Sequence, residues 1–244
     1  LSLQTYKSQY GTVAEDEVTI GMKSDRAALE GAWRPRHGFI QSVDWQASQT
    51  RYQHTEFEGS EAGTVFANKG HDGRIQLRHK PWQSGAGTWE GVWGLQSEQA
   101  RFSANGAEAF APFSHHQTQA LFAIEEFSFG KASVNLGVRR EQVSVQSLGN
   151  PDPSVDRFEL GTRKFSPQSY AMASSWQWLP NWRLSANVSR TERAPRDYEL
   201  FANGPHIATA AWERGQSGLG LEKANSMDLS AQWQQGAHLM KLTA

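Results

Sequence analysis

Apolar and polar residues alternate one by one along several segments of the chain. In the segment 182–193, Trp182, Leu184 and Val188 share one parity, and polar residues occupy the other. The same alternation is present in three further segments, 39–50, 74–80 and 132–141. Side chains of a β-strand point alternately to its two faces, so this pattern predicts strands that separate two different environments.

The links between these predicted strands alternate in length. Short links fall at 34–38, 83–87, 130–131, 179–181 and 234–236, and long irregular links fall at about 58–72, 104–117, 147–166 and 194–223. Short turns at one end of the strands and long loops at the other are typical of outer-membrane barrels. A soluble sandwich, with strands of about five or six residues, gives no reason for this alternation.

We therefore predict an all-β fold, an antiparallel transmembrane β-barrel segment of about eleven strands within a larger barrel of about 22 strands. Residues 1–244 are expected to belong to one barrel domain. The residues near 60, 112, 155 and 205 should lie at one end of the strands, and those near 36, 85, 130, 180 and 235 at the other. Both chain ends fall within predicted strands, so these edge strands should lack one neighbour or pair with another chain.

Aromatic residues are abundant in a chain that is polar overall, with ten tryptophans and twelve phenylalanines. Many of them flank the short links: Trp33, Phe39, Trp82, Trp89, Phe127, Phe129, Trp178, Trp182 and Trp233. Amphipathic rings favour the headgroup level of a bilayer, so these residues are expected to form an aromatic belt on the periplasmic side.

Charge and composition exclude several functions. The net charge of −1 argues against an electrostatic partner such as nucleic acid, and the absence of cysteine excludes disulfides and thiolate metal sites. The longest uninterrupted apolar run, at 120–124, is far shorter than the ~18 residues of a membrane helix. No motif positions a nucleophile, so we expect no enzyme activity. A soluble tryptophan-rich sandwich that binds carbohydrate is the alternative from another class.

The segment 190–215 is predicted to be a long irregular loop, because prolines, glycines and charged residues interrupt any helix. It includes ERAPRDYELFANGPHIATAAWERG and is followed by LGLEKANSMDLSAQW. These residues resemble the barrel signature of TonB-dependent outer-membrane receptors, with Arg-x-Pro at a strand end, Glu-Leu in the loop and Leu-x-x-Glu before the next strand. The sequences ELFANGPHxAT, HTEFEGSEAGTVFANKG and ANGAEAFAPF resemble the branch that contains zinc-uptake receptors.

This resemblance implies a receptor in the bacterial outer membrane that actively imports a metal or metal complex, most simply zinc. A haem or siderophore receptor of the same fold is the alternative. The implied partners are outer-membrane lipid, the metal or metal-chelate cargo, and the TonB complex, which would be engaged through a plug domain. The plug and the final barrel strands are expected to lie outside these residues. No resident cofactor is expected, and Zn²⁺ would be transported rather than retained.

Candidate metal ligands come from histidines and carboxylates at the predicted loop end. If the inward parity of the strand at 39–50 continues, His54, Glu56 and Glu58 face the lumen. Nitrogen and oxygen donors suit Zn²⁺, although a solvated polar extension of the strand would show the same pattern. His206, in Gly-Pro-His, matches the family motif, and the resemblance implies that loop histidines and carboxylates bind the metal.

Two adjacent histidines, His115 and His116, form a further possible capture site. Within a strand their side chains would point to opposite faces, so only one of them could serve a common centre. We further expect that His206 and Glu56 or Glu58 meet one zinc ion above the lumen.

Overall fold

The computed structural model describes residues 1–12, 17–206 and 211–244. The long strands are β1 (Ser2–Gly11), β2 (Val18–Trp33), β3 (Ile40–Glu58), β4 (Glu61–His79), β6 (Gly87–Asn105), β7 (Ser114–Phe129), β8 (Ala132–Ser147), β10 (Gln168–Leu179), β11 (Trp182–Arg193), β14 (Glu222–Gln235) and β15 (His238–Thr243). The shorter elements are β5 (Trp82–Ser84), β9 (Gly161–Phe165), β12 (Asn203–His206), β13 (Ala211–Arg214), the five-residue helix α1 (Asp197–Phe201) and the 3₁₀ turn η1 (Pro153–Val155).

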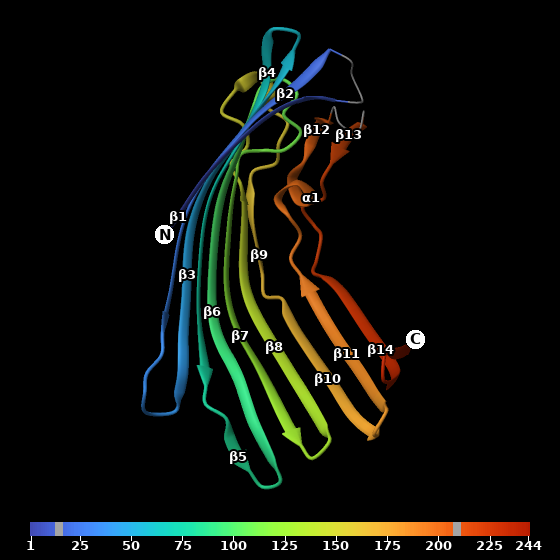
Figure 1. Cartoon of the computed structure of the whole chain (residues 1–244). Coiled ribbons are helices and arrows are strands. Elements are labelled where there is room, and N and C mark those ends of the chain that lie inside the picture. Colours follow the sequence, from blue (N-terminus) through green and yellow to red (C-terminus); the bar gives the residue numbers. More distant parts are fainter. Residues whose placement is uncertain (13–16, 207–210) are drawn as a thin grey trace.

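The long strands form one curved antiparallel sheet (Figure 1). These eleven strands follow one another in the order β1-β2-β3-β4-β6-β7-β8-β10-β11-β14-β15. The short strand β5 pairs with β6, and the short strand β9 pairs with β8. The all-β fold and the expected eleven consecutive strands are confirmed. The sheet is open within the described residues, because β1 pairs with β2 and β15 pairs with β14, at opposite edges.

The two ends of the strands differ as predicted. Figure 1 shows tight turns at the lower end and α1, β12 and β13 at the upper end. Since neighbouring strands are antiparallel, the turns after β2, β5, β7, β10 and β14 share the lower end, and the links at 106–113, 148–160 and 194–221 share the upper end. We call these the turn end and the loop end.

The prediction of a long link at 58–72 is wrong. Strands β3 and β4 continue to a two-residue turn at Gly59 and Ser60, and Glu58 lies directly opposite Glu61. Glycines and polar residues between 58 and 72 imitate a loop in sequence, but backbone pairing between β3 and β4 continues through them to the turn. Gly59 adopts a φ of +59°, which glycine tolerates without strain.

The strand register confirms the predicted outward face. Val134, Leu136 and Val138 of β8 lie beside Ser174, Met172 and Tyr170 of β10, and Met172 in turn lies beside Val188 of β11. Leu136, Val138, Met172 and Val188 are all exposed in the structure. An exposed apolar band of this kind is the lipid-facing surface of a membrane barrel.

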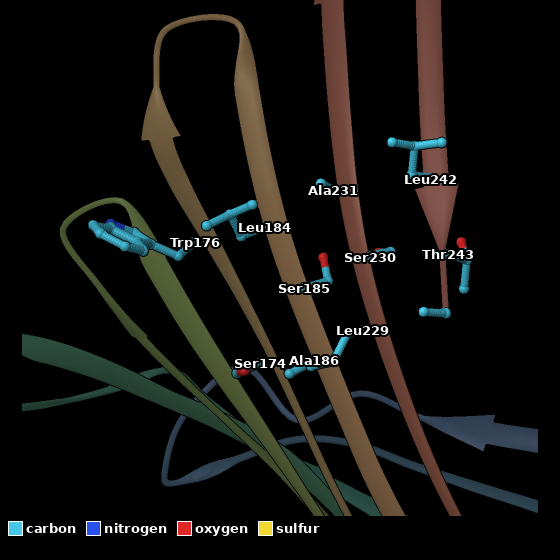
Figure 2. Close-up of a pocket in the computed structure, with 11 residues that line it drawn as sticks. Ser174, Trp176, Leu184, Ser185, Ala186, Leu229, Ser230, Ala231, Leu242 and Thr243 are labelled. Carbon is cyan, nitrogen blue, oxygen red and sulfur yellow. The ribbon is translucent and has the colours of Figure 1, made fainter.

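A hollow of about 510 Å³ interrupts this apolar band near the last strands (Figure 2). Trp176, Leu184, Ala231 and Leu242 lie in a row across β10, β11, β14 and β15. The hollow is thus a depression within the lipid-facing surface, and the side chains that line it are mostly apolar. Among the described residues, no helix is long and apolar enough to cross a membrane.

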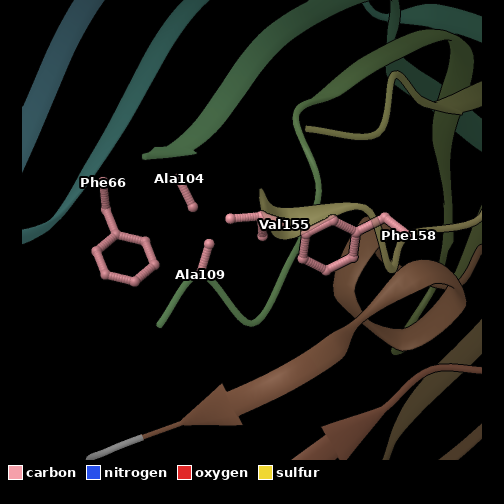
Figure 3. Packing of buried hydrophobic residues seen from close by; sticks show 5 residues of the cluster. All are labelled: Phe66, Ala104, Ala109, Val155 and Phe158. Atoms are coloured by element: carbon pink, nitrogen blue, oxygen red, sulfur yellow. The ribbon is translucent and has the colours of Figure 1, made fainter. Parts of the chain in front are cut away.

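Two clusters of buried apolar side chains lie at the loop end of the sheet. One cluster joins Phe66 of β4 and Ala104 of β6 to Ala109, Val155 and Phe158 from two of the links (Figure 3). A second cluster packs Leu200 and Phe201 of α1 against Val143 and Val145 of β8. These clusters fix the loops over the inner face of the sheet, which is the face that carries the candidate site.

Candidate functional site

A cavity of about 620 Å³ lies between the inner face of the sheet and the links at its loop end. Its strand side carries Asp72 of β4, Glu98 of β6 and His116 of β7. Its loop side carries Phe110 from the 106–113 link and Arg196 immediately before α1. The cavity therefore combines acidic, basic, imidazole and aromatic groups in one space.

The strand register brings the acidic groups of this cavity together. Asp72 lies directly opposite Glu98, so both carboxylates project from one face of the sheet. Asp72 accepts a hydrogen bond from the Ser48 hydroxyl, and Glu98 accepts one from the Gln96 amide. Like charges on opposed residues destabilise a sheet, so this pair favours a cation or a donor-rich ligand between the strands.

The predicted histidine pair is divided between the two faces, as expected for a strand. His116 lines the cavity, and its Nε2 lies 3.0 Å from the Thr118 hydroxyl. His115 has the opposite parity and lies beside Arg101 of β6. Only His116 is therefore positioned to contact a ligand in the cavity.

Helix α1 is tied to the wall of the cavity. The Ser114 hydroxyl of β7 donates a hydrogen bond to the Asp197 carboxylate. Leu200 and Phe201 are buried on the sheet side of the helix. The expectation of an irregular loop without a helix over 190–215 is wrong at residues 197–201, because a single helical turn needs only a local cap and two buried apolar residues.

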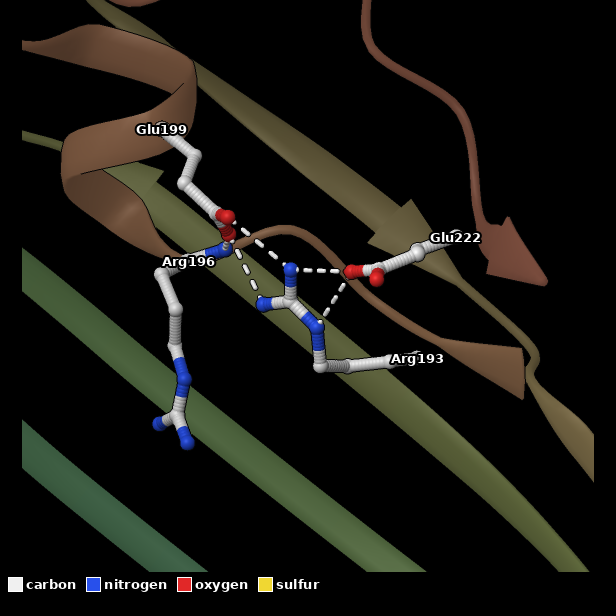
Figure 4. Close-up of polar contacts among 4 residues, drawn as sticks. All are labelled: Arg193, Arg196, Glu199 and Glu222. Atoms are coloured by element: carbon white, nitrogen blue, oxygen red, sulfur yellow. Dashed lines mark hydrogen bonds and ion pairs between the residues drawn. The ribbon is translucent and has the colours of Figure 1, made fainter. Parts of the chain in front are cut away.

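The local cap of α1 comes from Glu199 (Figure 4). Its Oε2 accepts a hydrogen bond of 2.6 Å from the backbone N–H of Arg196. The Arg193 guanidinium donates to both Glu199 oxygens, at 2.8 and 2.9 Å, and through Nε to Glu222 at 2.8 Å. The hydrogen bonds from Arg193 hold the pKa of the Glu199 carboxyl below its ordinary value.

Arg157 joins three separate links above the cavity. Its guanidinium donates to the carbonyl oxygens of Asn203 at 2.7 Å, Ala107 at 2.9 Å and Ala109 at 2.6 Å. The Asn203 side-chain amide donates back to the Arg157 carbonyl at 2.7 Å. Burial lowers the pKa of Arg157, and the three carbonyl acceptors compensate for the lost solvation. The loops therefore form a connected cover.

The predicted ligands His54 and His206 are placed in a row of aromatic rings. His54 stacks on Phe66 at 4.6 Å, Phe66 contacts Phe110 at 6.0 Å, and Phe110 stacks on His206 at 4.4 Å between ring centroids. The imidazoles are thus connected through two phenyl rings. Nδ1 of His206 also contacts the Glu213 carboxylate across the β12–β13 hairpin.

The predicted carboxylates separate from one another at the tip of the β3–β4 hairpin. Glu58 is exposed beside the turn, opposite Glu61. Glu56 is half-buried at an irregularity in the β3–β4 register, between Thr55 and Phe57. In the described part of the chain, no three His, Asp or Glu residues form a group able to hold a metal ion. A shared zinc site of His206 with Glu56 or Glu58 stays a prediction.

Asp72, Glu98 and Asp197 were not among the residues predicted from sequence. Asp72 was assigned to a loop, so the parity that it shares with Arg74 and Gln76 was not used. Glu98 follows Gln96 at a two-residue interval, and this signal would have identified an inward polar row. Asp197 lies outside the main sheet, and only the three-dimensional structure brings it to Ser114. Residues 207–210 of the ELFANGPHxAT sequence lie outside the described residues.

A family model described as "TonB dependent receptor-like, beta-barrel" matches residues 4–244. This match extends over nearly the whole chain and over all strands that line the cavity.

Solved structures with the same fold include a hemophore receptor HasR of Serratia marcescens in complex with its hemophore HasA and heme. It has a TM-score of 0.78 and 11% identity, over 99% of this chain and 42% of that chain. The copper transporter OprC has a TM-score of 0.67 and 11% identity, over 95% of this chain and 42% of its own. The ferric citrate transporter FecA has a TM-score of 0.65 and 15% identity, over 99% and 39%. The chain therefore spans about two fifths of the length of these structures.

Proposed function

The chain belongs to the TonB dependent receptor-like β-barrel family, and on this premise we propose that it forms part of the wall and the loop cover of a receptor that imports zinc. Proteins of this family are barrels of the bacterial outer membrane, so the apolar outward band contacts lipid and the loop end faces the exterior. A soluble carbohydrate-binding sandwich is not favoured by this membership.

The observation that supports zinc is the donor set of the cavity. Asp72, Glu98 and His116 line one cavity and carry carboxylate oxygens and an imidazole nitrogen, which are donor types that suit Zn²⁺. The three do not form one ready-made metal group within the described residues, so we propose that they meet an incoming Zn²⁺ ion one or two at a time. The cavity lies at the loop end of the inner face, where an incoming cargo would first leave the exterior. Water or residues of a plug domain would supply the remaining ligands, and TonB engagement would proceed through that plug.

The aromatic residues around the cavity favour a second candidate cargo, haem or a metal chelate. Phe102 and Phe110 line the cavity, and Trp212 projects beside Arg157 at the loop end. Flat apolar rings suit a planar or aryl-bearing ligand better than they suit a bare cation. The neighbours named above bind or transport copper, heme or ferric citrate, so the fold accommodates both types of cargo.

The experiment uses the full-length receptor in detergent and compares zinc binding with haemin binding by competition. We expect zinc to bind and haemin to compete poorly. The double change Asp72→Asn with Glu98→Gln should raise the Kd for zinc about tenfold or more, equivalent to about 1.4 kcal/mol. Zinc-limited growth should slow accordingly at unchanged surface levels.

The matched control is Glu90→Gln with Glu126→Gln. These two acids also lie directly opposite each other and have the inward parity, but they lie at the turn end. Zinc binding should be unaffected in this variant. The changes His206→Ala and Glu56→Ala with Glu58→Ala test the sequence-derived site separately. If haemin binds tightly and zinc does not, the cargo is a metal chelate and the zinc proposal is wrong.

A further inference from the structure

Basic residues form a row across the outward face near the loop end. Lys7 of β1 lies directly opposite Lys23 of β2, and Arg51 of β3 lies opposite Lys69 of β4. Lys69 in turn lies opposite Arg101 of β6. All five side chains are exposed. The five residues come from five successive strands of the sheet, β1, β2, β3, β4 and β6. Arg51 lies opposite Asp25 and is therefore offset by two residues from Lys23.

Parity assigns this row to the outward face of the sheet. Arg51 shares the parity of Trp45, which is exposed in the apolar band, and Lys69 shares that of Ile75. The opposite parity at this level carries His54, which stacks on the buried Phe66 of the inner cluster. The basic row therefore faces outward, a few residues beyond the apolar band in the direction of the loops.

A hollow of about 660 Å³ lies among these basic residues. Lys7, Lys23, Arg51 and Lys69 all line it. Gly21 and Ala67 also line it, and their small size leaves the space between the long basic side chains open. The arrangement is a recess surrounded by cationic groups rather than a row of separate surface charges.

The positive charge of this row is only partly neutralised by the protein. Asp25 is the acidic residue among those that line the hollow, and its Oδ2 lies 2.8 Å from Lys23 Nζ. Arg51, Lys69 and Arg101 form no ion pair with another described residue. Like charges on directly opposed strand residues are unfavourable, so an external anion would stabilise the row.

We propose that this basic recess, lined by Lys7, Lys23, Arg51 and Lys69 and flanked by Arg101 opposite Lys69, binds the phosphorylated headgroup of a lipid in the outer leaflet. The location supports a lipid, because the recess borders the apolar band at the level where headgroups meet the exterior. The residue types support phosphate, because guanidinium groups bind it in a bidentate manner and ammonium groups bind it as point charges. The acyl chains of the same lipid lie against the apolar band.

The test measures the binding of bis-phosphorylated lipid A to the full-length receptor in detergent by native mass spectrometry. The triple change Arg51→Gln, Lys69→Gln and Arg101→Gln should raise the Kd about tenfold or more. The wild-type receptor should bind enzymatically dephosphorylated lipid A with a similar loss. Arg51→Lys with Arg101→Lys keeps the charge and should retain most of the binding, which separates lost charge from failed folding.

The matched control is Arg34→Gln, Arg36→Gln and Lys131→Gln, which removes the same charge from exposed positions at the turn end. It should leave the binding unchanged. Equal binding by the wild type and the Arg51, Lys69 and Arg101 variant would overturn the proposal. It would also be overturned if inorganic phosphate or an acidic polysaccharide without acyl chains displaced lipid A at comparable concentrations, because the recess would then bind a soluble anion.

Discussion

At the residue scale, Glu199 holds helix α1 of the loop cover in place. It caps α1 through the Arg196 N–H and receives two hydrogen bonds from Arg193. The same Arg193 contacts Glu222 at the start of β14. One carboxylate thus connects the end of β11, the helix and the beginning of the next long strand.

We predict that the loop cover loosens in acid because of Glu199. Its folded-state pKa is lowered from 4.5, so its contribution to stability is fully present above pH 4.5 and is lost as the pH falls through the lower folded-state value. Limited proteolysis of the 194–221 link should therefore accelerate below pH 4.5 in the wild type. Acid-stable proteases keep the measurement comparable across the pH range.

Glu199→Gln supplies the control for this prediction. The variant should be cleaved faster than the wild type at pH 7 and should lose most of the wild-type pH dependence. Glu61→Gln removes an exposed carboxylate from the β3–β4 hairpin and should keep the wild-type pH profile. If Glu199→Gln and the wild type show the same acid profile, another group controls the loosening.

At the element scale, pairs of a small and a large residue shape the lipid-facing surface of the strands. Gly31 of β2 lies directly opposite Trp45 of β3. The indole covers the glycine, because a Cβ at residue 31 would lie 2.2 Å from the Trp45 ring. A large aromatic ring that covers a glycine on the neighbouring strand is a known way to pair such residues.

We predict that Gly31→Val displaces the Trp45 ring and lowers the free energy of unfolding by about 1 to 3 kcal/mol. Urea-induced unfolding in detergent or lipid vesicles would measure the change. The double variant with Trp45→Ala should recover part of the loss, because the clash is removed. Gly73→Ala serves as the matched control, since the nearest atom to its added Cβ is 3.9 Å away. Equal losses for Gly31→Val and Gly73→Ala would contradict the covering contact.

At the scale of the whole molecule, the sheet has two surfaces and two ends with different roles. The outward surface is apolar in its middle and basic towards the loop end, whereas the inner surface carries the polar cavity. The three links at the loop end are joined by Arg157 and by the apolar cluster of Val155 and Phe158. Cargo recognition and lipid binding would therefore use opposite faces of the same strands.

We predict that Asn203 and Asn181 lie on opposite sides of the outer membrane. The chain has no cysteine, so single cysteines at these positions can be labelled without removing native thiols in this segment. On intact cells, a membrane-impermeant maleimide should label Asn203→Cys and leave Asn181→Cys unlabelled. Both positions should react after the outer membrane is permeabilised. Labelling of Asn181→Cys on intact cells would contradict the assigned orientation.

The sequence alone determined the strands, their two faces and the alternation of turn and loop ends. These features depend on the two-residue period of a strand and on local turn residues, so they are readable from neighbouring positions. The parity of Trp182, Leu184 and Val188 was sufficient to assign the lipid-facing side of β11. The aromatic flanks of the turns and the family signature required no tertiary information either.

Only the tertiary structure decided which distant residues meet. Polar residues after Glu58 looked like a loop, but pairing between β3 and β4 extends the hairpin and gives Asp72 its inward position opposite Glu98. The short helix depends on Arg193, Glu222 and a buried contact with β8, all contributed by other parts of the chain. The cavity and the basic recess likewise depend on register across several strands, because contacts between strands are set by the sum of many long-range pairings rather than by any local pattern.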